Sequence, residues 1–438
     1  MTRSKHNIFR KLKDSDNYIL LNPLSKQADI LSPELAREYE KGNIADPTEF
    51  IEKGYLSDEG EENRRYRNAY LSFIEAREAE EVQVFFVPTY ACNFACSYCY
   101  QESYDHANDS RNPELTDAFF RWLDTELAGR KKYITVFGGE PLLPSSASRN
   151  VLERILTKAA DRKLSVAVVT NGYELENYIP LLSSASIREV QVTLDGVGVV
   201  HDRRRPLHGG GATFDRIVRG IDAALAAGIP INLRAVVDRE NLPHLPELAR
   251  FAIARGWTGN PLFKTQLGRN YELHTCQIDQ KKLYSRISLY EELYALIKEN
   301  PEFLEFHRPA YSVTKFLFEH GELPDPLFDS CPGTKTEWAL DYTGKVYACT
   351  ATVGKKGEEL GTFYPEISRR DEAIEEWEDR DVTSIPECAN CNLQLTCGGG
   401  CAAVAKNTKG KILSPDCRPT DKLLSMGIPL YFTIPGDK

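Results

Sequence analysis

The stretch EVQVFFVPTYACNFACSYCYQ, residues 81–101, joins a run of β-branched and aromatic residues to three closely spaced cysteines. The run before the proline predicts a β-strand, because short apolar segments rich in Val and Phe favour strands. Cys92, Cys96 and Cys99 follow directly after it. The stretch therefore predicts a sheet whose first strand carries a thiol-rich loop at its carboxyl end.

Downstream of this strand, strand-like runs alternate with amphipathic helical runs. The helical runs 114–129, 213–228 and 245–256 each end in Gly, a residue that commonly ends helices. The alternation predicts a parallel sheet wrapped by helices. Six strands are two short of a closed eightfold barrel, so we expect an α/β fold built on a partial (β/α)6 barrel, with functional residues at the carboxyl ends of its strands. The six expected strands are residues 81–88, 133–137, 165–170, 188–194, 231–237 and 261–267.

The rest of the chain departs from this pattern. Residues 1–80 begin with a β-like segment, NYILLNPLSKQADIL, and continue into polar helical runs rich in Glu and Arg, which predicts a small N-terminal α+β domain. Residues 81–310 would hold the barrel and a helical connector. Residues 311–438 contain seven of the eleven cysteines and would form a third, cysteine-rich domain.

Composition limits the possible partners. The chain has 438 residues, 42% apolar and 27% charged, as in ordinary globular proteins. Its net charge of -10 argues against nucleic acid, because binding to a phosphate backbone depends on a basic surface. No stretch approaches the roughly 20 apolar residues of a membrane span. We therefore expect a cytoplasmic protein with neither nucleic acid nor membrane as a partner.

Cysteines in a reducing compartment indicate metal ligands rather than disulfides. Three interpretations compete for the first group. Structural zinc takes four ligands, and the nearest fourth candidate, His106, lies in a polar loop. Three inert buried thiols rarely occur at this spacing. A 4Fe-4S cluster is normally held by four thiolates, so three would leave one iron open to a substrate or cofactor.

The spacing C-x3-C-x2-C, with the aromatic Tyr98 before the third cysteine, resembles that of the radical S-adenosylmethionine (radical SAM) enzymes. The resemblance implies that the open iron binds the amino and carboxylate groups of S-adenosylmethionine. One electron, supplied by a flavodoxin or ferredoxin, would cleave this cofactor to methionine and a 5′-deoxyadenosyl radical. The radical would then remove a hydrogen atom from the substrate.

Segments at the ends of later strands resemble the cofactor-binding segments of the same family. FGGEP, residues 137–141, resembles the segment whose glycine backbone and glutamate hold the amino group of the methionine moiety. TNG (170–172), TLDG (193–196) and HDRRR (201–205) resemble the contacts on the ribose and carboxylate sides. By this resemblance the cofactor-binding residues are Tyr98, Gly138, Gly139, Glu140, Thr170, Asn171, Thr193, Asp195 and Arg205.

The C-terminal cysteines resemble the SPASM extension of these enzymes, which carries auxiliary 4Fe-4S clusters; zinc is the alternative for a bare Cys-x2-Cys pair. The resemblance implies three clusters in all. The first auxiliary cluster would be held by Cys388, Cys391, Cys397 and Cys417, and the second by Cys331, Cys349 and Cys401. Relatives with full ligation of the second cluster have a further cysteine where this chain has Asp325. Asp325, a substrate group, water or the remote Cys276 are the candidates for the last ligand, and a solvated surface acid is the other interpretation of Asp325.

SPASM enzymes mostly modify peptides or proteins, so the resemblance implies a large substrate. NPLSKQADILSPE, residues 22–34, loosely resembles the winged-helix-like elements of peptide maturases, in which a leader peptide adds a strand to a sheet edge; a purely structural cap is the alternative. We expect a maturase that binds a ribosomally made precursor peptide with a leader and forms a carbon–carbon or thioether crosslink in it.

Two other functions remain open at this point. A formylglycine-generating sulfatase maturase usually has Asp where this chain has Thr350. A zinc-binding scaffold for protein interactions is the alternative from another class. The sequence offers His201, Tyr342 and Glu337 as general bases and does not select one of them.

Overall fold

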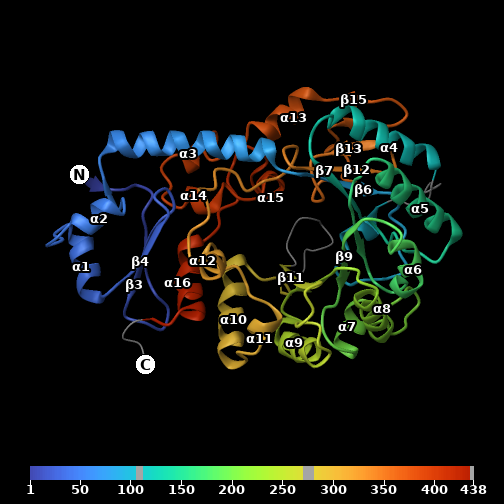
Figure 1. Ribbon diagram of the computed structural model, residues 1–438, viewed down its shortest axis with the longest axis horizontal. Helices are drawn as coiled ribbons and strands as arrows, with labels where there is room; N and C mark the ends of the chain where they lie inside the picture. Colours follow the sequence, from blue (N-terminus) through green and yellow to red (C-terminus); the bar gives the residue numbers. More distant parts are fainter. Residues whose placement is uncertain (105–111, 270–280, 435–438) are drawn as a thin grey trace.

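The computed structural model describes residues 1–104, 112–269 and 281–434. It places a large sheet and its covering helices at one end of the molecule and a small N-terminal sheet at the other (Figure 1). The long helix α3 (Glu59–Ala79) runs along the molecule between these two parts. In the described ranges, no helix has the length and apolar character needed to cross a membrane.

The six expected parallel strands are all present and pair in chain order. Their residues alternate between two environments: in β10, for example, Leu233 and Ala235 are buried in the core beneath the helices, whereas Asn232 and Arg234 line an inner cavity. This alternation follows from the two-residue period of a strand. The strands are β6 (Val82–Val87), β7 (Lys132–Val136), β8 (Val166–Thr170), β9 (Ile187–Thr193), β10 (Ile231–Val237) and β11 (Phe263–Arg269).

Helices connect these strands and cover their outer face (Figure 1). Phe119 of α4 stacks on Phe86 of β6 with ring centroids 4.4 Å apart. Gly228 and Gly256, the predicted helix ends, have φ values of 76° and 73°, the left-handed conformation that ends many helices. The helices are α4 (Pro113–Glu126), α5 (Ser146–Asp161), α6 (Leu175–Leu182), α7 (Val199–Arg204), α8 (Phe214–Ala226) and α9 (Leu245–Ala254), with 3-10 turns at Tyr100–Ser103 and Leu242–His244.

A seventh parallel strand, β12 (Glu337–Asp341), extends the sheet beyond β6, with Ala339 opposite Phe85. The sequence analysis did not predict the pairing of β12 with β6. Gly344, with φ 82°, lies in the turn that follows β12. The sheet then continues antiparallel through β13 (Lys345–Tyr347), β14 (Gly361–Thr362) and β15 (Ser368–Arg369). Cys349, which follows β13, is thereby brought to the barrel.

The N-terminal region is an α+β unit, as expected. Its antiparallel sheet has the order β2-β3-β4, and Leu20, Tyr39, Phe50 and Tyr55 share its buried core. The elements are β1 (Thr2–Arg3), β2 (Ile8–Lys11), β3 (Tyr18–Asn22), β4 (Gln27–Leu31), α1 (Pro33–Lys41), α2 (Thr48–Glu52) and β5 (Leu56–Ser57), which pairs with β1.

The C-terminal part returns to this N-terminal sheet, because Leu424 and Ile428 of α16 share a core with Ile8 and Leu21.

The described part of the expected connector contains α10. The domain boundaries at residues 80 and 310 stay predictions. The remaining helices are α10 (Arg286–Glu299), α11 (Phe303–Phe306), α12 (Thr314–His320), α13 (Asp371–Glu378), α14 (Gln394–Cys397), α15 (Ala402–Lys409) and α16 (Thr420–Tyr431), with a 3-10 turn at Pro386–Cys388.

Candidate active site

The partial barrel encloses a cavity of about 800 Å³. Residues of the parallel strands β6 to β11 form its wall. Cys92, Cys96 and Cys99 line it beyond the carboxyl end of β6, and Thr350 and Ala351, which follow Cys349, line it as well. One cavity therefore borders both the first cysteine group and the loop after β13.

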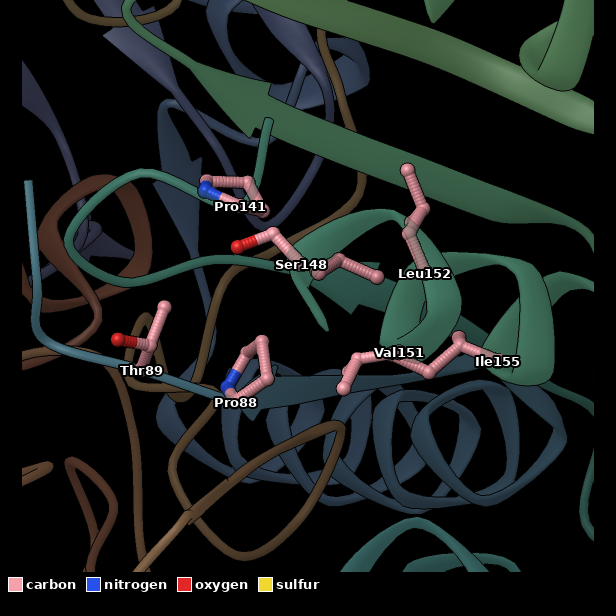
Figure 2. Close-up of a pocket in the computed structure, with 8 residues that line it drawn as sticks. Pro88, Thr89, Pro141, Ser148, Val151, Leu152 and Ile155 are labelled. Atoms are coloured by element: carbon pink, nitrogen blue, oxygen red, sulfur yellow. The ribbon is translucent and has the colours of Figure 1, made fainter. Parts of the chain in front are cut away.

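A much smaller pocket of about 10 Å³ lies between the ends of β6 and β7 and helix α5 (Figure 2). Pro88, Thr89 and Pro141 face Val151 and Ile155 of the helix across it. Its lining is mostly apolar and its volume is that of about one water molecule. It is a packing defect behind the 138–141 turn rather than a ligand site.

The three thiols of the first group lie close together. Burial raises the pKa of Cys92 to about 12, and the charges of Glu140, Cys96 and Cys99 contribute to this increase. Burial likewise raises the pKa of Cys96 to about 11, although the nearby Arg205 opposes the increase. A buried thiolate becomes favourable when a metal cation compensates its charge. The environment is therefore suited to thiolates that are held by metal.

Within the parts of the chain that the structure describes, no three His, Cys, Asp or Glu side chains converge closely enough to hold one metal ion. A 4Fe-4S cube places iron and sulfide between its thiolates. The thiolates of such a cube therefore lie farther apart than the ligands of a single ion.

The turn after β7 packs directly against the loop that leads to Cys92. A Cβ atom on Gly139 would lie 2.2 Å from the carbonyl oxygen of Ala91, and one on Gly138 would lie 2.6 Å from that of Thr89. The N–H of Gly139 donates to the Thr89 carbonyl at 3.0 Å. Because a side chain at either position would collide with this loop, the close approach requires glycine. Both glycines also line the cavity.

Glu140 is 1% exposed and is not among the residues that line the cavity. Its carboxylate accepts hydrogen bonds from Thr170 Oγ1 (2.7 Å), the Asn171 N–H (2.6 Å) and the Leu142 N–H (2.7 Å). Burial raises the pKa of Glu140 to about 7, although these hydrogen bonds oppose the increase. The Glu140 carboxylate therefore fastens the ends of β7 and β8 together, and its contact with the cofactor stays a prediction.

Tyr98 and Arg205 form a polar corner of the cavity wall. The Tyr98 hydroxyl donates to Asp195 Oδ2 at 2.6 Å and accepts from Arg205 Nη1 at 2.7 Å. The Nε of Arg205 is buried and has no hydrogen-bond partner among the described residues. Arg205 therefore keeps a donor available for an anionic ligand.

The predicted cofactor residues divide into two sets. Asp195 is fully buried and, like Glu140, lies behind the wall, where it also accepts from the Val236 N–H at 2.8 Å. Asn171 donates to Asn93 Oδ1 at 2.7 Å and lies 3.9 Å from Cys92 Sγ. The cavity wall itself contains Tyr98, Gly138, Gly139, Thr170, Asn171, Thr193 and Arg205.

The sequence analysis missed the role of Arg204. This side chain is 1% exposed and donates to Asp195 (3.3 Å), Asp238 (2.8 Å) and Glu240 (3.2 Å). It therefore holds the carboxylate that supports Tyr98. The only signal in the sequence was the triplet of arginines in HDRRR, and the triplet does not reveal which arginine faces the cavity.

The candidate bases differ in their positions. His201 is fully buried and accepts from the Asp195 N–H at 3.2 Å through Nδ1; burial lowers its pKa to about 3, which keeps it neutral. Glu337 accepts from the N–H of Thr350 at 2.9 Å, and burial raises its pKa. Tyr342 lies against Tyr90, with ring centroids 5.5 Å apart. The Glu337 carboxylate contacts Thr350, a residue of the cavity wall.

The C-terminal cysteines form two groups. The charges of Cys331 and Cys401 add to the effect of burial in raising the pKa of Cys349. Burial raises the pKa of Cys388 to about 11, with contributions from the three other members of its group. The two groups correspond to the two ligand sets implied by the sequence. They are Cys331, Cys349 and Cys401, and Cys388, Cys391, Cys397 and Cys417.

Asp325 lies in a solvated position. Its side chain is 91% exposed and forms an ion pair with Lys26 at 3.1 Å. This observation favours the interpretation of Asp325 as a surface acid. Cys276 and His106, the other ligand candidates, lie outside the described residues.

Residues 86–252, which hold the three thiols and the cavity-lining strands β7 to β10, match the model of the Radical SAM superfamily. This chain contains a radical SAM domain. The prediction from the C-x3-C-x2-C spacing is confirmed.

Two kinds of relative share sequence with this chain. Mycofactocin maturase MftC of Mycolicibacterium smegmatis is 26% identical over 75% of this chain and 80% of its own length. GTP 3′,8-cyclase of Agrobacterium fabrum is 30% identical over 38% of this chain. The match spans 46% of that cyclase, about half its length, so its activity as a whole protein is not transferred to this chain.

Solved structures share the fold of the enzyme. The anSMEcpe structure with bound AdoMet has a TM-score of 0.60 and 17% identity, over 79% of this chain and 97% of its own. SuiB of Streptococcus suis, bound to S-adenosylmethionine, has a TM-score of 0.54 and 15% identity, over 96% and 99% of the two chains. These likenesses support the partial-barrel architecture.

The cofactors of the domain are a 4Fe-4S cluster and S-adenosylmethionine, and the residues fit them. Cys92, Cys96 and Cys99 would hold the cluster, and the unpartnered Nε of Arg205 would receive the cofactor carboxylate. When bound, the pair supplies a 5′-deoxyadenosyl radical through one-electron cleavage of S-adenosylmethionine. Gly138 and Gly139, which line the cavity, would orient the cofactor there, and the barrel strands would surround the reacting groups.

Proposed function

We propose that this radical SAM enzyme is a peptide maturase, which forms a carbon–carbon or thioether crosslink in a ribosomally made precursor peptide. The observation that carries the proposal is the single cavity shared by Cys92, Cys96 and Cys99 with Thr350 and Ala351. Its volume of about 800 Å³ lies at the upper end of the range for ligand pockets. It has room for S-adenosylmethionine together with a short segment of peptide.

Two relatives support a peptide as the substrate. MftC is named as the maturase of mycofactocin. A SuiB structure with a TM-score of 0.54 was solved with its precursor peptide SuiA, and its likeness extends over 95% of this chain. The N-terminal sheet adds a physical reason, because β2 and β4 are edge strands. An edge strand can pair with an extended leader peptide.

The overall chemistry requires an electron acceptor. Formation of a crosslink removes two hydrogen atoms from the peptide. One leaves as a hydrogen atom to the 5′-deoxyadenosyl radical, and the other leaves as a proton and an electron. The group Cys331, Cys349 and Cys401 would hold an auxiliary 4Fe-4S cluster beside the cavity, where that electron could be received. The other C-terminal group would hold a third cluster, and a flavodoxin or ferredoxin would reduce the enzyme.

A formylglycine-generating sulfatase maturase is the second candidate. Thr350 replaces the Asp expected of that class, but Glu337 places a carboxylate 2.9 Å from the Thr350 N–H. The buried carboxylate lies next to the same wall of the cavity. This observation keeps the second candidate in consideration.

The reaction product distinguishes the two candidates. Reduced enzyme is incubated anaerobically with S-adenosylmethionine and either the short peptide encoded beside its gene or a sulfatase peptide with a Cys or Ser target. We expect 5′-deoxyadenosine and a precursor peptide lighter by two hydrogen atoms, with a new crosslink in its fragmentation spectrum. Conversion of the sulfatase peptide to an aldehyde, with the precursor unchanged, would support the second candidate and contradict the first.

A further inference from the structure

Several cationic side chains line the cavity. They differ in whether an acidic side chain forms an ion pair with them. Lys264 pairs with Glu189 at 2.5 Å, and Asn232 donates to the same carboxylate at 3.1 Å. Arg188 pairs with Glu81 at 2.6 Å and lies over the Tyr133 ring. These two cations therefore have acidic partners of their own.

Arg234 differs from them. It lies on β10 and lines the cavity, and it forms no ion pair with any residue that the structure describes. Its Nε is buried and has no hydrogen-bond partner in those residues. Arg234 therefore presents a partly buried guanidinium to the cavity, and within residues 1–104, 112–269 and 281–434 no anion matches it.

The backbone around Arg234 makes room for this side chain. A Cβ atom on Gly268 of the neighbouring strand β11 would lie 3.0 Å from Arg234 Nη2. Any larger residue at position 268 would crowd the guanidinium. On its other side, Arg234 pairs in register with Thr193 of β9. The guanidinium therefore lies beside the predicted cofactor site but on a different strand from it.

An unmatched guanidinium is costly in a site that excludes water, because its charge and its donors lose their hydration. A carboxylate is its best partner, since two parallel N–H···O bonds match the planar fork of arginine. S-adenosylmethionine has one carboxylate, for which Arg205 already offers a donor. Since none of the described residues supplies a carboxylate to Arg234, a second carboxylate at this place would come from another molecule.

We propose that Arg234 binds a carboxylate of the substrate, either an acidic side chain or the C-terminal carboxylate of the peptide. The inference rests on the proposed peptide substrate and makes it more specific, because it selects peptides that bring a negative charge into the barrel. The bound carboxylate would fix the depth to which the peptide enters the cavity.

The test uses matched peptides and the intact holoenzyme with S-adenosylmethionine. The probes are acetyl-Gly-Glu-Gly-amide, acetyl-Gly-Gln-Gly-amide and acetyl-Gly-Gln-Gly with a free carboxylate, together with glutarate alone. Binding is measured anaerobically by calorimetry. We expect at least one of the two charged peptides to bind about tenfold more tightly than the neutral one, because hydrogen bonds between two charged groups are stronger than those between a charged and a neutral group.

The variants Arg234→Gln and Arg234→Lys test whether the tighter binding of charged peptides depends on Arg234. Arg234→Gln should abolish it while changing the affinity for S-adenosylmethionine less than twofold, and Arg234→Lys should retain part of it. Arg188→Gln is the matched control and should leave the preference intact, because that arginine already pairs with Glu81. The thermal midpoint of Arg234→Gln should not fall, since the substitution removes an unmatched charge; this measurement confirms that the variant is folded.

Several outcomes would overturn the inference. Equal binding of charged and neutral peptides, or a preference that survives in Arg234→Gln, would exclude a carboxylate site at this arginine. A loss of affinity for S-adenosylmethionine in that variant would assign Arg234 to the cofactor instead. Binding of glutarate through Arg234 without binding of any peptide would retain the carboxylate site and contradict the proposed peptide substrate. Binding of neither kind of probe would contradict the carboxylate site itself.

Discussion

Arg380 is fully buried and donates hydrogen bonds to four backbone carbonyls, at distances from 2.7 to 3.2 Å. Two of the carbonyls belong to Gly399 and Gly400, between Cys397 and Cys401, and the others to Ile412 and Ser414, ahead of Cys417. A single guanidinium thus fixes the loops that carry cysteines of both C-terminal groups. We regard Arg380 as a positioning residue for these groups.

Replacing Arg380 with Met should lower the iron content of the C-terminal groups and the thermal midpoint, because four buried carbonyls lose their donor at a cost of about 1–3 kcal/mol each before relaxation. Arg370→Met is the control, since that exposed side chain donates to one carbonyl, that of Glu359. Iron assay and thermal unfolding check the prediction. Equal iron content and equal midpoints in the two variants would show that Arg380 does not position the loops.

His6 is a buried, neutral histidine in the N-terminal region. It is stacked on Tyr66 with ring centroids 5.2 Å apart, and burial, aided by the charge of Lys5, lowers its pKa from 6.5 to about 4. Its approach to Glu62 at 3.7 Å is therefore not an ion pair at neutral pH. Between pH 6.5 and 4 the unfolded chain binds a proton that the folded chain does not, so the free energy of unfolding falls as the pH falls.

His6→Phe should keep the stacking and remove this pH dependence. The wild type should lose about 3 kcal/mol more than the variant between pH 7 and pH 4, since each pKa unit corresponds to about 1.4 kcal/mol. Chemical denaturation across this range provides the measurement, with His320→Phe at an exposed position as the control. Parallel stability curves for wild type and His6→Phe would contradict the assignment.

Among single residues, the sequence revealed those of unusual type or spacing. The cysteines stood out because thiols ligate metals, and the pair Gly138–Gly139 stood out because FGGEP resembles a cofactor-binding segment of the family. Polar cofactor-binding residues were named only where a family segment contains them, as with Arg205. Arg204 and Arg205 are adjacent in sequence and take opposite roles, and Arg234 was invisible because its significance lies in the missing partner, which only the three-dimensional surroundings reveal.

Helix α3 attaches the N-terminal sheet to the cysteine-rich region. Its residues Tyr66, Tyr70 and Phe73 surround Phe328, with ring centroids 5.1, 5.2 and 5.6 Å away. Two of them also donate hydrogen bonds, Tyr66 to Gln394 at 2.9 Å and Tyr70 to Asp381 at 2.8 Å. The helix therefore forms an aromatic joint between parts of the chain that are distant in sequence.

Phe328→Ala should cost about 3–5 kcal/mol, the usual range for a fully buried Phe, and should loosen α3. Phe318→Ala, at a position 40% exposed, should cost much less. Thermal unfolding gives the stability, and hydrogen exchange of the α3 amides reports on the joint. Comparable losses in the two variants, with unchanged exchange in α3, would show that the joint does not depend on Phe328.

Among the elements, the six strands β6 to β11 could be predicted because each is a short apolar run between helical runs of clear period. The pairing of β12 with β6 could not be predicted. Side chains alternate between the two faces of a strand whichever strand it pairs with, so the sequences of β6 and β12 do not reveal that they are neighbours. Tertiary packing sets the register of such a pair. This pairing decides the site, since it carries Cys349 and Thr350 to the cavity.

The whole molecule brings three groups of thiols into one fold. The strand β12 joins the cysteine-rich region to the barrel sheet, and α16 returns the chain to the N-terminal sheet. The overall architecture followed from the sequence through the resemblance to radical SAM enzymes. The relative placement of the parts, which depends on contacts between distant segments, came from the structure.

The central claim is that Cys92, Cys96 and Cys99 hold the cluster that cleaves S-adenosylmethionine. The most direct measurement is iron content together with release of 5′-deoxyadenosine, in anaerobically prepared, reduced wild type and in the triple variant Cys92→Ala, Cys96→Ala, Cys99→Ala. The account predicts about twelve irons per chain and release in the wild type, against about eight irons and no release in the variant. Release that persists in the variant, or zinc in place of iron in the wild type, would contradict it.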